Sequence, residues 1–349
     1  MRANIGRIMA DSPPENVNFD SKMEALREIA LTADEHRFSP DEMIACRACS
    51  RSNPPDRTSC LYCGVALEAA SLRPDIAKMN YQRPETWQDG FSLVYAGKTG
   101  LESGILENAA DLLRVEHDAL ERMIAVGVPI PLIYLKSLTD AGLLGSRLSD
   151  AGFDCAIVGD DLLQPKVPPT RVRTVQFDSD AILLEDFNTS SVTPVKYDER
   201  VLLVTGSLVK TSTEVTGKVS KRAVKTMEET FAISDEAVVD IYPVSDVYGF
   251  RIRSSGFDFS CLGERMQRFA TVNMAALIGD LRSRFTSGVF IDSFPTASPL
   301  FGPVWPVEEI KQASSVSRGP LGGIRKQNLT VLDNTSQFTK FSRLQRHFI

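Results

Sequence analysis

The chain has 349 residues, of which 43% are hydrophobic and 24% charged, so it can form two or three globular domains with sizeable cores. Its net charge of −6 argues against a protein that binds nucleic acid over its whole surface. No apolar run reaches the length of a transmembrane helix, and the first residues lack the apolar segment of a signal peptide. We therefore expect a cytoplasmic protein without a transmembrane segment, and peripheral contact with a membrane stays open.

The first 41 residues predict a leader and a short helix. Residues 12–14, Ser-Pro-Pro, interrupt regular structure. Asp20 or Ser21 can cap a helix that runs to about Glu35.

Four cysteines within residues 42–68 predict a zinc ribbon. They form two C-x-x-C pairs, Cys46/Cys49 and Cys60/Cys63, separated by a segment rich in turn-forming residues. Four thiolates around one centre match structural Zn²⁺, so we expect one ion per chain. Gly64 can supply the positive φ that a metal-binding turn requires. The alternatives are two disulfides or four unrelated cysteines, but free thiolates fit a reducing compartment.

These cysteines resemble those of bacterial Cys₄ zinc-ribbon proteins, which often serve as interaction modules. The spacing Cys49-x₃-Asn53-x₆-Cys60 is also similar to the Ran-binding-protein-type zinc finger, which implies binding of single-stranded RNA or ubiquitin. The tryptophan of that family is replaced here by Ile44. An RNA-binding alternative would depend on Asn53, Arg47, Arg51 and Arg57.

Residues 69–89 predict a linker, and residues 90–165 predict a small α/β module. Its expected order is a strand over 91–95, one or two helices over 106–124, a strand-like segment at 130–135, a helix after Ser137 and a strand at 153–158. Ser137 and Asp140 suggest the start of the last helix, and Gly152 can end it. The segment Leu144-x-x-x-Leu148-x-x-Ala151-Gly152-Phe153 resembles the C-terminal domain of the ribosomal stalk protein and the related Clp protease adaptor, which implies an α/β shape.

Residues 168–286 predict an antiparallel β domain closed by a helix. Short strands are expected between 171 and 209 and between 238 and 254, with a mobile segment at 210–228 between them. Residues 262–285 predict one helix, with Met266, Phe269, Leu277 and Leu281 packed on the sheet. This order resembles the pleckstrin-homology-like superfold, and Val195 to Val204 resembles its step from a turn into a core strand.

Residues 287–349 contain many prolines and glycines and predict an extended basic tail. We identify two basic clusters as candidate surfaces for an acidic protein partner. They comprise Lys218, Lys221, Arg222 and Lys225 in the β domain, and Arg325, Lys326, Lys340, Arg343 and Arg346 in the tail. The alternatives are a solvated hairpin for the first cluster and docking on the chain's own acidic surface for the second.

Residues with catalytic potential do not form a recognisable set. His117-Asp118 lacks further histidines at ligand spacing, Gly159-Asp160-Asp161 is typical of a turn after a strand, and Cys155 is expected to be a buried, inert thiol. The sequence therefore predicts a multidomain α+β protein that acts as a non-enzymatic, zinc-binding scaffold or adaptor. Two alternatives stay open: a single-stranded RNA-binding protein, and a regulatory subunit of an enzyme or of a membrane-associated complex.

Overall fold

The structure is a computed structural model that describes residues 43–54, 60–65, 67, 82–84, 88–97, 100–219, 225–246, 248–318 and 324–349. The chain forms two compact units, Met1–Asn80 and Tyr81–Ile349. The leader and short helix expected before residue 42 lie outside the described residues, as does most of the expected linker at 69–89. The described residues form a mixed α+β protein with a large β sheet.

The first unit contains a short antiparallel pair, β1 (Ile44–Ala45) and β2 (Ser52–Asn53). Ile44 pairs with Asn53 and Ala45 with Ser52, so the chain reverses direction between them. The first C-x-x-C pair lies in this reversal. Among the described residues of this unit, Ile44 and Leu67 are buried aliphatic side chains.

The second unit begins with a three-stranded sheet and its helices. β3 lies between β4 and β5 and is antiparallel to both. The elements are β3 (Phe91–Tyr95), α2 (Ser103–Leu113), α3 (His117–Ala125), β4 (Ile130–Leu135), α4 (Leu138–Asp150), β5 (Ala156–Gly159) and α5 (Asp160–Leu163). Their order is the strand–helix–helix–strand–helix–strand order that the sequence predicts.

Both ends of α4 follow the sequence signals. The Ser137 hydroxyl accepts a hydrogen bond from the backbone N–H of Asp140 at 3.4 Å, which caps the first turn. Gly152 has a φ of +83°, the left-handed conformation that glycine adopts after a helix. Leu144 and Leu148 are fully buried between these ends and fix the helix on the sheet.

The large sheet has the order β13-β14-β9-β10-β11-β6-β7-β8, with β12 also paired to β9. The pairs are antiparallel except β11–β6 and β12–β9. Its strands are β6 (Thr170–Phe177), β7 (Ala181–Asp186), β8 (Val192–Lys196), β9 (Val201–Val219), β10 (Lys225–Pro243), β11 (Phe250–Arg253), β12 (Val289–Ile291), β13 (Glu308–Arg318) and β14 (Ile324–Asp333).

The base of β9 is buried on both faces. Leu202 and Val204 belong to one hydrophobic core, whereas Val201 and Leu203 belong to another. Successive strand residues point to opposite faces, so two separate cores sandwich the sheet at this point. This explains the continuous apolar run at the start of the strand.

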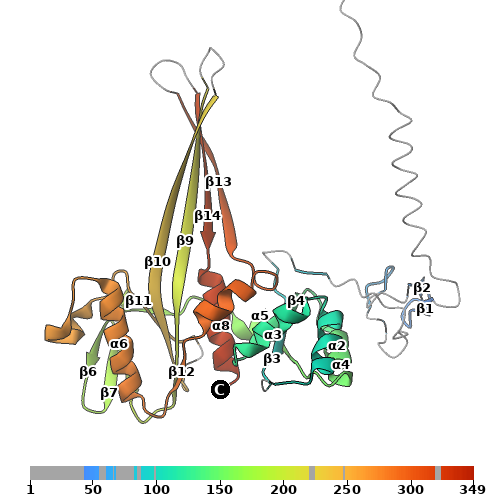
Figure 1. Cartoon of the computed structure of the whole chain (residues 1–349), viewed down its shortest axis with the longest axis horizontal. Helices are drawn as coiled ribbons and strands as arrows, with labels where there is room; N and C mark the ends of the chain where they lie inside the picture. Colours follow the sequence, from blue (N-terminus) through green and yellow to red (C-terminus); the bar gives the residue numbers. More distant parts are fainter. Residues whose placement is uncertain are drawn as a thin grey trace, which may run out of the picture. The chain divides into compact units, whose positions relative to one another are not determined.

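The described parts of the segment 210–228 that was expected to be mobile, residues 210–219 and 225–228, instead belong to the outer halves of two long paired strands. β9 and β10 pair from Val201↔Pro243 to Val219↔Lys225. The tail, expected to be extended, forms the hairpin β13–β14, and β14 pairs with the outer half of β9. We call these four paired segments, residues 210–219, 225–236, 308–318 and 324–333, the blade (Figure 1). No signal in the sequence indicated the pairing between β14 and β9, whose paired residues lie about a hundred positions apart.

The helix expected over 262–285 is interrupted. The chain forms a 3₁₀ segment, η4 (Phe259–Arg265), and then α6 (Ala270–Arg284). Asn273 explains the break, because its side chain accepts from the backbone N–H of Gln267 at 2.6 Å and donates to the Gln267 carbonyl at 2.8 Å. These bonds hold the preceding turn away from helical geometry.

The break changes which residues pack. Leu277 and Leu281 are fully buried against the sheet, as expected. Met266 and Phe269 are instead 53% and 66% exposed, so their predicted packing is wrong. α6 covers one face of the sheet, and the resemblance to the pleckstrin-homology-like superfold extends no further than a sheet packed against a helix.

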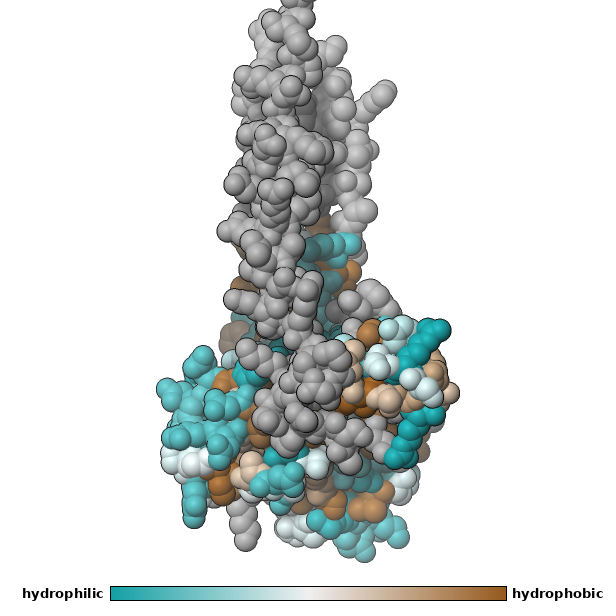
Figure 2. Space-filling model, turned by 90° about the vertical axis from the view of Figure 1, so that its right-hand side faces the viewer, coloured by the Kyte–Doolittle hydropathy of each residue, from teal (hydrophilic) through white to brown (hydrophobic). Residues whose placement is uncertain are grey.

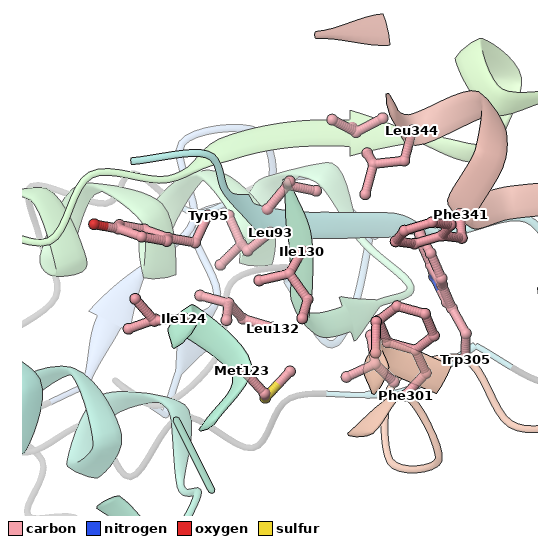
Figure 3. Packing of buried hydrophobic residues seen from close by; sticks show 14 of the residues in the cluster. Leu93, Tyr95, Met123, Ile124, Ile130, Leu132, Phe301, Trp305, Phe341 and Leu344 are labelled. Carbon is pink, nitrogen blue, oxygen red and sulfur yellow. The ribbon is translucent and has the colours of Figure 1, made fainter. Parts of the chain in front are cut away.

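The rest of the tail packs into the core of the second unit. α7 (Phe294–Ala297), η5 (Ser298–Leu300) and α8 (Thr335–His347) follow the sheet strands. Figure 3 shows Phe301, Trp305 and Phe341 beside the side chains of β3 and β4. The segments 90–165, 168–286 and 287–349 therefore belong to one compact unit with a shared core.

Candidate metal centre and charged sites

Two similar turns hold the four cysteines. After Cys46, the backbone N–H of Ser50 donates to the Cys46 carbonyl at 2.7 Å, and Ser50 has a φ of +57°. After Cys60, the N–H of Gly64 donates to the Cys60 carbonyl at 3.0 Å, and Gly64 has a φ of +74°. Each turn brings its two thiols to one side, and the positive φ expected at Gly64 is confirmed.

The four sulfur atoms form one cluster. The Sγ atoms of Cys46, Cys49, Cys60 and Cys63 all lie within 4.8 Å of one another. The distances are 3.6 Å from Cys46 to Cys63 and 3.5 Å from Cys49 to Cys60. A tetrahedron with metal–sulfur bonds of about 2.3 Å has sulfur–sulfur edges of roughly 3.8 Å, and a disulfide bond is about 2.05 Å long. The donor set fits a tetrahedral metal ion and does not fit two disulfides.

The Asn53 side chain contacts one sulfur of the cluster and two backbone groups of the adjacent turns. Its amide nitrogen lies 3.4 Å from the Cys60 sulfur and 2.9 Å from the Arg51 carbonyl, and its oxygen accepts from the Leu61 N–H at 2.8 Å. Asn53 is fully buried, so it cannot contact a base as the RNA-binding alternative requires. In the sequence, this asparagine was identified only as part of the RNA-binding alternative, with no sign of its contact with Cys60.

Hydrogen bonds favour the ionised form of Cys60. Burial alone raises the pKa of this thiol. Bonds from the backbone of Tyr62 and Cys63 and from the Asn53 amide outweigh burial and lower the pKa to about 6. A thiolate is the form that binds a metal ion, and the amide of Asn53 and the N–H of Tyr62, both 3.4 Å from the Cys60 sulfur, favour that form.

The surface beside the cluster is mixed in character. The guanidinium of Arg51 lies 4.7 Å from the centre of the Tyr62 ring. Tyr62 and its neighbour Leu61 are each more than half exposed. Arg57, the fourth residue of the RNA-binding alternative, lies outside the described residues.

Backbone pairing brings the two basic clusters together at the outer end of the blade. Lys218 on β9 is the register partner of Arg325 on β14, and Lys326 pairs with Gly217. Lys225 begins β10 opposite Val219. Lys221 and Arg222 lie outside the described residues. Residues separated by about a hundred positions in sequence thus share one end of the sheet, which the sequence alone did not indicate.

The remaining tail residues of the candidate surface bind inside the protein. Lys340 forms a salt bridge with Asp160 at 3.0 Å and has only 12% of its side chain exposed. Buried Arg343 donates to the carbonyls of Leu163 at 3.0 Å and Val167 at 2.6 Å. Lys340 and Arg343 were therefore wrongly predicted as a surface for a partner. Lys340 instead docks on an acidic residue of the same chain, Asp160, as the alternative for this cluster proposed.

Arg346 is half-buried and also contacts the chain itself, but at the surface. It donates to the Val244 carbonyl at 3.0 Å from the last turn of α8. Cations near a helix C-terminus are favourable because of the helix dipole. This contact ties the end of α8 to the turn that follows β10.

The partners of Lys340 form a buried polar group that sequence reasoning missed. The Tyr134 hydroxyl donates to Asp160 Oδ2, and the Lys340 ammonium lies 4.4 Å from the Tyr134 ring centre. Burial, together with the Asp160 carboxylate, raises the pKa of Tyr134. Asp160 begins α5 directly after β5, so the turn predicted from Gly159-Asp160-Asp161 is present but also carries a buried charge.

A second buried ion pair fixes α8 to the sheet. Arg251 donates to both carboxylate oxygens of Asp240 at 2.7 Å and to the Thr339 hydroxyl at 3.1 Å. Tyr242 donates to Asp240 and accepts from Ser342 at 3.0 Å. The pair satisfies its polar atoms across three elements, as burial requires.

The other cysteines do not resemble nucleophiles. Burial raises the pKa of Cys155 to about 12, in agreement with the expectation of an inert thiol. Burial, with Asp280 and Asp258, raises the pKa of Cys261 to about 11. Both sulfurs are therefore protonated at neutral pH.

We find no family model, curated protein or solved structure that matches this chain. Among the helices of the described residues, none is long and apolar enough to cross a membrane. The fold and the cysteine cluster define a mixed α+β protein with a candidate four-cysteine metal site.

Proposed function

We propose that this chain is a non-enzymatic, zinc-binding scaffold or adaptor of the bacterial cytoplasm that binds an acidic protein partner. The observation that carries the proposal is the register of the blade, which gathers Lys218, Lys225, Arg325 and Lys326 at its outer end. Arg318 joins them because it pairs with Ile324 at the start of β14. These basic residues at the end of the blade are the proposed binding surface for the acidic partner.

Charge contrast supports an acidic partner. The chain as a whole carries −6, whereas at the outer end of the blade these five basic residues outnumber Glu228 and Glu229. A local positive region on an acidic protein directs an acidic surface to one place and repels it elsewhere. Exposed charges are screened over about 8 Å at physiological ionic strength, so binding should weaken as salt is added.

The cysteine cluster supports a structural zinc ion. Four thiolates complete a tetrahedral shell and leave no position for a substrate, which is typical of zinc that stabilises a fold. In this proposal Cys46, Cys49, Cys60 and Cys63 hold the ion, and Asn53 orients Cys60. The ribbon then gives the adaptor a second, separately folded module.

The regulatory-subunit alternative shares this surface and differs only in the partner. The RNA-binding alternative is disfavoured, because Asn53 is buried beneath the cluster. Nucleic acid bound through the phosphate backbone would still show steep salt dependence, so the identity of the bound molecule must be measured directly.

The test is an affinity purification from the native cell with a salt series. One variant changes Lys218, Lys225, Arg325 and Lys326 to Ser. The matched control changes the same number of exposed basic residues elsewhere, namely Lys136, Lys196, Arg200 and Arg268. We expect the control to retain a protein that the first variant loses. Equal recovery by both would refute the proposal, and recovery of nucleic acid alone would replace the acidic protein as the partner.

A further inference from the structure

Over residues 225–236, one edge of β10 has no strand beside it in the part of the chain that the structure describes. β9 pairs with β10 along its whole length. On the other side, β11 pairs only with residues Val238 to Ile241, and Ser254 donates to the Ala237 carbonyl. Residues 225–236 therefore present an unpaired backbone edge among the described residues.

This edge carries charged residues but lacks two other devices by which proteins protect exposed edges, a bulge and an internal proline. β13, the outer strand on the opposite side of the blade, is disrupted by a register shift between Gln312 and Ser315. β10 pairs with β9 without a register shift, and its single proline is its last residue, Pro243. A regular edge strand without a bulge or an internal proline is a template for another strand.

The side chains along this edge are also unusually apolar for solvent. Every residue from Thr230 to Asp235 is exposed, with Phe231 at 64% and Ile233 at 71%. Ile233 pairs with Thr211, which pairs with Leu332, itself 42% exposed. Directly paired residues share a face, so the apolar surface continues from β10 to β14. Figure 2 shows another side of the molecule, on which brown, apolar residues are scattered among teal, hydrophilic ones.

We propose that a second copy of this chain pairs with this edge, β10 against β10, in an antiparallel arrangement about a two-fold axis at Thr230. A two-fold axis perpendicular to the sheet leaves each side chain on the same face of the sheet in both copies. Residues that stand opposite each other share a face, so their numbers must differ by an even number. The axis therefore passes through a residue and cannot fall between two residues. This restricts the register to a few discrete choices, which the sequence of the strand can distinguish.

Complementarity selects the axis at Thr230. It places Lys225 opposite Asp235 of the second copy, and Met227 opposite its Ile233. Phe231 stands opposite Glu229 of the second copy, and the two Phe231 positions become diagonal neighbours, within reach of aromatic side chains. Each pair occurs twice by symmetry.

Neighbouring axes are worse. An axis at Phe231 sets the two Phe231 residues against each other, but it sets Met227 against Asp235 and so removes the Lys225–Asp235 pair. An axis at Ala232 sets Glu229 against Asp235, and like charges directly opposite are destabilising. An axis at Glu229 sets that carboxylate against itself.

The first test is the oligomeric state of the full chain by sedimentation over a wide concentration range. We expect a dimer, and we expect the variant Phe231→Lys with Ile233→Lys to be a monomer. Phe269→Lys is the matched control, because Phe269 is equally exposed but lies at the start of α6. A wild-type chain that stays monomeric at every concentration, or a dimer that persists in the double variant, would overturn the proposal.

The second test addresses the register. Asp235→Lys should raise the dimer dissociation constant roughly tenfold, because two like-charge pairs replace two opposite-charge pairs. Lys225→Asp should do the same, and the combined variant should regain wild-type affinity. Thr230→Cys should form an interchain disulfide that Ser234→Cys does not. Failure of both the rescue and the cross-link would overturn the axis at Thr230. Lys225 belongs to both surfaces, so the Asp235→Lys variant, which leaves the basic residues of the outer end unchanged, distinguishes failure of the dimer from failure of the adaptor proposal.

Discussion

Removing the charge of Asp240 should destabilise the second unit strongly. Asp240 is fully buried, and Arg251 has 6% of its side chain exposed. Burial lowers the pKa of Arg251, but the adjacent Asp240 outweighs burial and raises it. Asp240→Asn keeps the shape of the side chain and leaves the guanidinium without its counter-charge in the interior.

The expected loss follows from the geometry. A buried pair broken on one side costs about 3–5 kcal/mol, because the remaining charge is uncompensated. Two hydrogen bonds of 2.7 Å depend on the carboxylate, and Tyr242 donates a third. The same network reaches α8 through Thr339, so part of the loss should appear as weaker docking of that helix.

Urea unfolding measured by tryptophan fluorescence is a suitable assay, because Trp305 is buried and Gln337 of α8 donates to its carbonyl at 2.7 Å. Asp89→Ala is the control, since the Lys166–Asp89 pair is exposed and should contribute little. Replacing both partners, Asp240→Leu with Arg251→Met, should recover most of the loss. A single variant within about 1 kcal/mol of wild type, or a double variant as unstable as the single, would refute this reasoning.

Three further outcomes are expected. The purified chain should contain about one zinc ion, and Cys60→Ser should lose it, as elemental analysis would show; equal zinc in both proteins would count against the site. Leu277→Asp should cost several kcal/mol by burying an unpaired charge under α6, and an unchanged melting temperature would contradict that packing. The raised pKa of Tyr134 means that its contribution is complete below about pH 10 and is lost as pH rises toward the folded-state pKa. Tyr134→Phe should therefore flatten the loss of stability in alkaline urea titrations, and an unchanged alkaline slope would disagree.

Local signals in the sequence were sufficient to predict structures that form between residues close together in the sequence. The cysteine spacing, Gly64, the Ser137 cap and Gly152 each act within a few residues, and all four are present as expected. The helical spacing of Leu144 and Leu148 also located α4, because both residues share one face.

The tail was misjudged because its stabilising partners are distant. α8 contains few apolar residues, yet Phe338, Phe341 and Leu344 recur at helical spacing and are fully buried. That spacing was the available signal, and the neighbouring prolines and glycines obscured it. Polar Arg343 and Gln345 are buried too, because the Leu163 and Pro129 carbonyls accept their hydrogen bonds.

In the blade, the sequence identifies the basic segments but does not show which of them are neighbours in the fold. Lys218 and Arg325 each belong to a basic segment that composition identifies, but only the pairing of β9 with β14 makes them neighbours. The same pairing leaves one edge of β10 regular and unoccupied, while a bulge interrupts β13. An outer end rich in basic residues favours a partner held by charge, whereas an apolar, unpaired edge favours a strand. The blade therefore offers two chemically distinct surfaces, and salt should weaken binding at the first while leaving pairing at the second largely intact.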